Sequence, residues 1–164
     1  MLILGLNMFH ADASAAILED GKVVFGIAEE RLNRVKHYAG FPTLAIQACL
    51  DAVGAKISDI DHVAVGQDTD ANLAKKVRYA ISNPAKLVNF IRLRKRKQNL
   101  RNVRELIATN LECDSQALGF AVHHLEHHIA HIASAYYCSP WDEASGFSYD
   151  GSGDFVSTML PSCE

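Results

Sequence analysis

Cysteine is too sparse and too scattered in this sequence to hold a disulfide framework. The four cysteines lie far apart and form no Cys-x-x-Cys pair, and the N-terminus carries neither a basic leader nor a cleavage site. Long hydrophobic runs are absent as well, because no apolar segment approaches the roughly 20 residues that a membrane-spanning helix needs. We therefore expect a reduced, cytoplasmic protein with no membrane partner.

The sequence has little excess charge of either sign, with 16 Lys and Arg against 19 Asp and Glu. This balance gives the whole chain no attraction to nucleic acid or anionic lipid. Internal repeats and low-complexity tracts are also lacking. What is present, 49% hydrophobic and 21% charged residues over 164 positions, is typical of one folded globular domain.

Short apolar segments alternate with helical patterns, which predicts an α/β domain with a mixed sheet. Three strands are expected first, at 2–6, 14–18 and 22–28. The Asp20-Gly21 step suits a tight hairpin turn between the second and third strands. A helix over 43–53, closed by Gly54, then leads to a strand at 60–65.

The last third of the chain returns to the same pattern. In order, we expect a strand, a helix and two further strands, at 120–122, 125–137, 144–149 and 155–160. The chain then ends without a capping helix or a polar tail, which would leave a sheet edge open. The sequence is therefore expected to be an N-terminal fragment of a larger protein.

Residues 71–110 differ in kind and are predicted to form a basic helical insertion on this domain. Eleven of the sixteen Lys and Arg fall between Lys75 and Arg104, with no acid in that interval. The favoured interpretation is a helical segment on the surface of the domain that is exposed to solvent or faces a partner. One alternative is that a basic cluster within it binds phosphates, formed by Arg92, Arg94, Lys95, Arg96 and Lys97. Another is a non-catalytic module whose basic helices, from Lys75 to Arg104, contact nucleic acid or an acidic partner protein.

Five of the eight histidines fall between His123 and His131, which points to a metal site. Residues four apart share a helix face, so His127 and His131 could bind one ion, as could His123 with His127, or His124 with His128. Imidazole suits zinc, iron, copper or nickel, and an acidic ligand would have to come from elsewhere. The same stretch also fits the H-x-x-E-H pattern of zinc metalloproteases, with Glu126 as general base.

Polar side chains gather in three other segments that follow or join strands. The stretch 7–14 carries His10, Asp12 and Ser14. The run 29–37 is densely charged, and alone it fits a solvated loop. Asp150-Gly151-Ser152-Gly153-Asp154 is expected to be a turn whose glycines allow a ligand to approach the backbone.

These motifs are weak singly but occur together and in order along nearly the whole chain outside 71–110. They are Gly5-Leu6-Asn7, His10 to Ala16, Glu29 to His37, Phe41-Pro42, His127 to Ala135, Ser139-Pro140 and Asp150 to Gly153. In this combination the sequence closely resembles the N-terminal part of the O-carbamoyltransferases of nodulation and of antibiotic tailoring, including the tobramycin-type enzymes.

The resemblance implies a domain of the actin, sugar-kinase and Hsp70 ATPase fold, followed in the family by a domain that makes carbamoyl-adenylate from carbamoyl phosphate and ATP. The first domain would pass the carbamoyl group to a hydroxyl of a sugar or natural product. By resemblance, His127 and His131 would hold a divalent ion, Fe²⁺ first, with Zn²⁺ or Mn²⁺ as alternatives. His10 and Lys36 would line the transfer site.

The resemblance also implies that further residues bind the substrate or nucleotide, namely Asp12, Asp150, Gly151 and Gly153. His10, Lys36 and Asp150 are expected around one cleft that also faces His127 and His131. The family's third metal ligand is an aspartate beyond position 164, and the adenylate-forming domain is absent from this sequence. The chain alone is therefore expected to be inactive and to need the rest of the enzyme as its partner, with homo-oligomerisation left open.

Overall fold

A computed structural model of the chain describes residues 1–10, 12–68, 71–82, 102–153 and 156–164. The chain divides into two compact units. Unit 1 comprises Met1–Gly66 and Asn102–His124, and unit 2 comprises Gln67–Arg101 and Leu125–Glu164. No helix among the described residues has the length and apolar character needed to cross a membrane.

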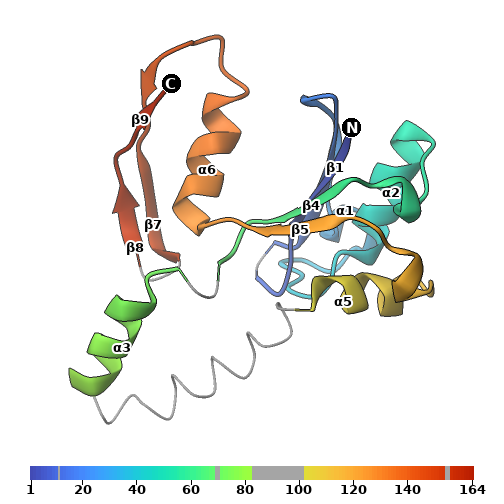
Figure 1. Ribbon diagram of the computed structural model, residues 1–164, viewed down its shortest axis with the longest axis horizontal. Helices are drawn as coiled ribbons and strands as arrows, with labels where there is room; N and C mark the ends of the chain where they lie inside the picture. Colours follow the sequence, from blue (N-terminus) through green and yellow to red (C-terminus); the bar gives the residue numbers. More distant parts are fainter. Residues whose placement is uncertain (11, 69–70, 83–101, 154–155) are drawn as a thin grey trace. The chain divides into compact units, whose positions relative to one another are not determined.

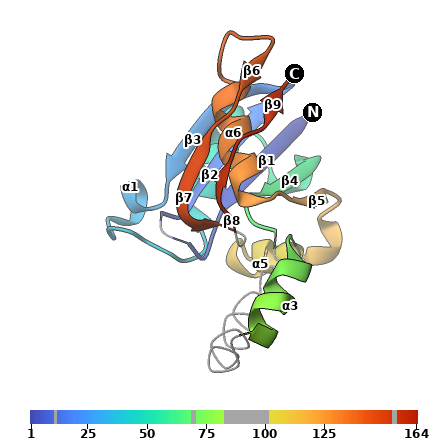
Figure 2. The ribbon, with the colours of Figure 1, turned by 90° about the vertical axis from the view of Figure 1, so that its left-hand side faces the viewer.

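Unit 1 is built on a five-stranded mixed sheet (Figure 1), whose strands have the order β3-β2-β1-β4-β5 and are all labelled in Figure 2. Its strands are β1 (Leu2–Asn7), β2 (Ser14–Glu19), β3 (Lys22–Ala28), β4 (His62–Val65) and β5 (Ala121–His124). The first three form an antiparallel meander, whereas β4 is parallel to β1, and β5 is parallel to β4. The mixed sheet confirms the predicted α/β class.

Alternating burial along the strands explains why these segments form a sheet. Leu4 lies opposite Ile17 on β2 and Val63 on β4, and all three side chains are fully buried. Side chains on a strand point alternately to its two faces, so this register lines one face with apolar groups. The hairpin from β2 to β3 turns at Asp20 and Gly21, whose φ angles of 50° and 79° are those of the tight turn expected there.

Helix α2 (Thr43–Val53) packs on β2 and β3 and buries the side of the helix that carries Ala45, Ile46, Cys49 and Leu50. It ends at Gly54 in the left-handed conformation (φ 65°), as the sequence predicts. The remaining elements of unit 1 are short: α1 (Glu30–Asn33), the 3₁₀ turns η1 (Ile57–Asp59) and η4 (Ser115–Ala117), and α5 (Val103–Asn110). Helix α5 buries Val103 and Ile107, one turn apart.

Unit 2 pairs a helix with a β-hairpin. Its elements are α3 (Leu73–Ser82), α6 (His127–Tyr136), β6 (Ala144–Ser145), β7 (Ser148–Gly153), β8 (Val156–Met159) and β9 (Ser162–Cys163). Strands β7 and β8 are antiparallel, as are β6 and β9. Helix α6 packs along the β7–β8 hairpin (Figure 2).

Two sequence-based expectations about these elements are wrong. His123 and His124 lie on β5 and α6 begins only at His127, so the pairs His123 with His127 and His124 with His128 do not share a helix face. Asp150 to Gly153 were expected in a turn but continue strand β7. The expected strand at 144–149 is correspondingly split between β6 and β7.

The proposed insertion at 71–110 is described only at its two ends, where α3 and α5 are helical as expected. The basic segment from Arg92 to Lys97 lies outside the described residues. The boundaries of the insertion therefore stay a prediction.

Candidate functional site

Helix α6 begins where it does because Glu126 caps it. The Glu126 carboxylate accepts a hydrogen bond from the backbone N–H of Ile129 at 2.9 Å, which satisfies one of the free donors of the first turn. From this start, the four-residue spacing of His127 and His131 places both rings on one face of the helix.

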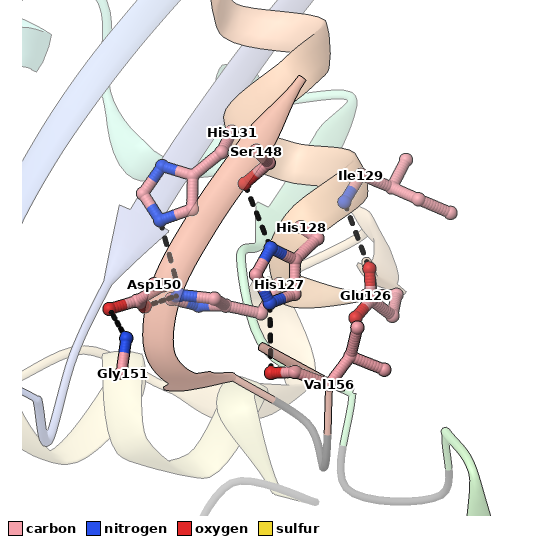
Figure 3. A network of polar contacts seen from close by, with 9 residues as sticks. All are labelled: Glu126, His127, His128, Ile129, His131, Ser148, Asp150, Gly151 and Val156. Carbon is pink, nitrogen blue, oxygen red and sulfur yellow. Dashed lines mark hydrogen bonds and ion pairs between the residues drawn. The ribbon is translucent and has the colours of Figure 1, made fainter. Parts of the chain in front are cut away.

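The two imidazoles converge, and a carboxylate from β7 joins them (Figure 3). The Nε2 atoms of His127 and His131 are 3.1 Å apart, and His127 Nε2 lies 2.7 Å from Asp150 Oδ2. One ligand atom from each of the three residues lies within 4.8 Å of the others. The His127 side chain is only 13% exposed, so this cluster is partly withdrawn from solvent.

The surroundings of Asp150 favour its ionised form. A hydrogen bond from His127, and after it one from the backbone N–H of Gly151, hold the pKa of the Asp150 carboxyl below its usual value. Both donors stabilise the carboxylate more than the neutral acid. The third member of the cluster is therefore an anionic oxygen ligand at neutral pH.

The donor set fits the divalent ion that the resemblance implies. Two imidazole nitrogens and one carboxylate oxygen are a combination that iron(II), zinc and manganese all accept. The resemblance places the acidic ligand for the histidine pair beyond position 164, and that expectation stays a prediction. In the structure, Asp150 brings a carboxylate to the pair from a strand 19 positions beyond His131.

The sequence suggests for the neighbouring His128 only a role as an ion-binding partner of His124, which lies on β5. The His128 side chain is fully buried, with Nδ1 2.8 Å from Ser148 Oγ and Nε2 2.9 Å from the carbonyl oxygen of Val156. Figure 3 shows this ring between α6 and the hairpin. No spacing signal could have revealed it, because its partners lie 20 and 28 positions away.

Unit 1 brings together the two loops that carry His10 and Lys36. The backbone N–H of Phe9 donates to the carbonyl of Gly40 at 3.1 Å, and that of Ala13 donates to the carbonyl of Tyr38 at 2.8 Å. Both His10 and Lys36 are exposed. The two predicted transfer residues therefore project from loops that are hydrogen-bonded to each other.

Asp12 pairs with a residue of the second loop. Its Oδ1 lies 3.0 Å from Nδ1 of His37, while the backbone N–H of His37 donates to Glu30 Oε2 at 3.0 Å. His37 has a φ of 53°, a left-handed conformation that is uncommon for a residue with a side chain. We call Asp12, Glu30 and His37 the loop clasp.

The metalloprotease interpretation is wrong. His123 lies on β5 in unit 1, where its Nε2 is 3.0 Å from Nδ1 of His62 on β4, and Glu126 is the cap of α6. An H-x-x-E-H site needs both histidines on one helix.

His10, Asp12 and Lys36 belong to unit 1, whereas the cluster of His127, His131 and Asp150 belongs to unit 2 together with Gly151 and Gly153. Their predicted approach to a single cleft stays a prediction.

The fold and the site together define an α/β domain with a candidate metal centre. Residues 2–164 match the family described as carbamoyltransferase N-terminus, and the chain belongs to this family. It is 32% identical to the uncharacterized protein sll1178 of Synechocystis sp. and 31% identical to the nodulation protein NolNO of Sinorhizobium fredii. These matches cover 96% and 94% of this chain but only 26% and 21% of the two relatives.

A further relative is the nodulation protein U of Rhizobium tropici, which is 28% identical over 88% of this chain and 24% of its own length. Among solved structures, YeaZ from Pseudomonas aeruginosa aligns with 98% of this chain and 63% of its own, at 17% identity and a TM-score of 0.43.

Proposed function

We propose that this chain carries the carbamoyl-transfer site of an O-carbamoyltransferase that moves a carbamoyl group from carbamoyl-adenylate to a hydroxyl of a sugar or natural product. The observation that supports this most directly is the convergence of His127, His131 and Asp150 in a chain of this family. Carbamoyl phosphate and ATP would be consumed in making the adenylate, a step we assign to the part of the enzyme that this chain does not include.

In this proposal His127, His131 and Asp150 would hold an Fe²⁺, Zn²⁺ or Mn²⁺ ion. A bound ion of this kind acts as a Lewis acid that polarises carbonyl and phosphate oxygens. Gly151 and Gly153 would let the nucleotide approach the backbone of β7, because neither carries a side chain.

His10 and Lys36 would carry out the proton and charge chemistry of transfer. The acceptor hydroxyl oxygen bonds to the carbamoyl carbon, the bond from that carbon to the phosphate oxygen of the adenylate breaks, and AMP leaves. His10 takes the hydroxyl proton on a ring nitrogen, because a neutral imidazole has one nitrogen that accepts a proton. Lys36 neutralises the negative charge on the departing phosphate.

The test uses the complete enzyme with His10→Ala and Lys36→Ala. Each change should reduce carbamoyl transfer by roughly 100-fold or more, the range of lost acid–base or electrostatic catalysis, and leave adenylate formation nearly unchanged. Lys22→Ala, which removes an exposed lysine of β3, is the matched control. Equal loss of both half-reactions, or unchanged transfer, would contradict the assignment.

A further inference from the structure

His128 connects α6 to both strands of the hairpin that carries Asp150. Its two ring nitrogens contact Ser148 on β7 and Val156 on β8, at 2.8 and 2.9 Å. The ring is fully buried, and Ser148 is only 7% exposed. These two contacts fix the orientation of the His128 ring, because water does not reach the ring and neither nitrogen can exchange its partner for solvent.

These contacts define the protonation pattern of the ring. A backbone carbonyl oxygen can only accept, so Nε2 of His128 carries the hydrogen that is donated to Val156. In the neutral ring Nδ1 is then an acceptor, and it receives the hydroxyl hydrogen of Ser148. With both nitrogens engaged in this way, His128 has no lone pair left to bind an ion.

The contacts of His128 lie immediately beside the candidate ligands. Ser148 is two residues before Asp150 on β7, and both side chains contact α6, Ser148 through His128 and Asp150 through His127. Val156 is paired with Gly153, at the other end of β7 from Ser148. His128 itself follows His127 directly on α6. One side chain thus attaches the helix that carries two ligands to the hairpin that carries the third, at two points.

We propose that His128 is a positioning residue that sets the distance between the His127–His131 pair and Asp150. The inference rests on the proposed metal centre. Two attachment points oppose both sliding of α6 along the hairpin and rotation of α6 about its own axis, and either movement would separate the imidazoles from the carboxylate. Residues that orient metal ligands in this way commonly contribute 10–100-fold to metal affinity.

The alternative is a histidine that only stabilises the core. In that case, substitution would lower the free energy of unfolding but leave metal affinity unchanged under conditions where the protein is folded. Metal affinity therefore separates the two roles, and it can be measured on this chain without any assay of activity.

The experiment titrates the purified chain with Zn²⁺ by calorimetry, at a temperature where circular dichroism shows every variant to be folded. The relevant site is the one whose binding is lost in His127→Ala. His128→Gln places an amide near the former Nε2 and keeps the contact with Val156, whereas His128→Asn places one near the former Nδ1 and keeps the contact with Ser148. Ser148→Ala removes only a hydroxyl group, so it still tests the contact between His128 and β7 if the two His128 variants fail to fold.

We expect His128→Gln and Ser148→Ala to weaken Zn²⁺ binding at this site by about tenfold, and His128→Asn to weaken it by a similar factor. One control should bind Zn²⁺ as the wild type does: Ser145→Ala, which removes an exposed hydroxyl group on β6. A long-range ¹H–¹⁵N spectrum should show the Nε2–H form of His128 in the wild type.

The outcomes distinguish the two proposals. If the wild-type chain binds no Zn²⁺ through His127, the metal centre itself is overturned. If the wild type binds through His127 but Ser148→Ala and both His128 variants bind equally well, only the positioning role is overturned. An Nδ1–H form of His128 would also overturn the positioning role.

Discussion

Burial lowers the reactivity of one cysteine, Cys49, in a way that the sequence does not show. Cys49 lies in α2 with no exposed surface, and burial raises the pKa of its thiol to about 11. The thiolate is the reactive form of cysteine, and desolvation disfavours it. Cys138, in contrast, is exposed.

This difference predicts the order of modification by iodoacetamide. At pH 8 a thiol of pKa about 11 is only about one part in a thousand thiolate, so Cys138 should react first and Cys49 only after unfolding. Peptide mass mapping after timed alkylation measures the order. The raised pKa also means that the folded state holds the thiol proton of Cys49 more tightly than the unfolded state does. The free energy of unfolding should therefore fall as the pH rises from the ordinary pKa of a cysteine toward 11. Cys49→Ala should remove that alkaline loss, and early labelling of Cys49 in the folded chain would contradict the prediction.

Removing the charge of Asp150 tests the candidate metal ligands directly. Asp150→Asn keeps the shape of the side chain but leaves two imidazoles without an anionic partner, which is an incomplete site. Zn²⁺ affinity measured by calorimetry should fall by more than the roughly 100-fold seen when outer groups are lost. Asp142→Asn, on an exposed loop of the same unit, should leave it unchanged. If Asp150→Asn and Asp142→Asn bind Zn²⁺ with equal affinity, Asp150 is not a ligand of this site.

Among the elements, α2 depends on a carboxylate supplied from outside it. Pro42 precedes the helix and offers no side-chain cap. Instead Glu29, which is 3% exposed, accepts hydrogen bonds from the backbone N–H groups of Leu44 at 3.2 Å and Ala45 at 2.7 Å. This carboxylate ties the end of β3 to the first turn of α2.

Glu29→Ala should therefore destabilise unit 1. The change leaves one buried and one part-buried backbone donor without their partner, and we expect the free energy of unfolding in urea to fall by about 1–3 kcal/mol. Glu19→Ala, which removes an exposed carboxylate of β2, should change it by less than about 0.5 kcal/mol. Similar values for the two variants would show that Glu29 does not cap α2.

The loop clasp predicts a local rather than a global effect. Asp12→Ala removes the acceptor for the His37 ring, in a pair whose side chains are 53% and 76% exposed. Exposed pairs contribute little to global stability, so amide exchange over 34–40 should accelerate by about fivefold, equivalent to roughly 1 kcal/mol. Asp51→Ala, which also loses one exposed side-chain hydrogen bond, should leave exchange in this loop unaltered. Unchanged exchange in Asp12→Ala would mean that other contacts hold the loop.

For the whole molecule, the strands of unit 1 could be predicted because their information is local. Short apolar segments and the Asp20-Gly21 turn are visible in the sequence, and the strands of the sheet follow them closely. The four-residue spacing of His127 and His131 likewise needs only a helix to bring the rings together.

The features that could not be predicted depend on partners far along the chain. His123 and His124 fit a strand or a helix equally well, and pairing with β4 decides for the strand. In the sequence, Asp150 and Gly151 suggest a turn. In the structure, pairing with β8 extends β7 past both residues to Gly153. The burial of His128 and of Glu29 is invisible in sequence, since a buried polar group is defined by the partners that satisfy it.

The chain by itself should show no carbamoyl transfer when supplied with carbamoyl phosphate, ATP and a sugar acceptor. The proposed adenylate step belongs to a part of the enzyme beyond this sequence, and this chain spans 26% and 21% of two relatives. Radiolabelled carbamoyl phosphate and chromatography of the acceptor provide the measurement. Turnover by the isolated chain would show that adenylate formation does not need another domain.

The pair formed by His62 and His123 has a practical consequence for purification. The two imidazoles lie on adjacent parallel strands and share a hydrogen bond of 3.0 Å between Nδ1 of His62 and Nε2 of His123. A tautomer change that moves the shared proton to the other nitrogen of its ring frees both of these nitrogens to bind immobilised nickel. An untagged chain should therefore be retained on such a resin and eluted by a shallow imidazole gradient, earlier for His62→Gln than for the wild type. Nickel that copurifies with the chain would then compete with Zn²⁺ in every later titration. The protein should therefore be treated with a chelator before its first calorimetric measurement.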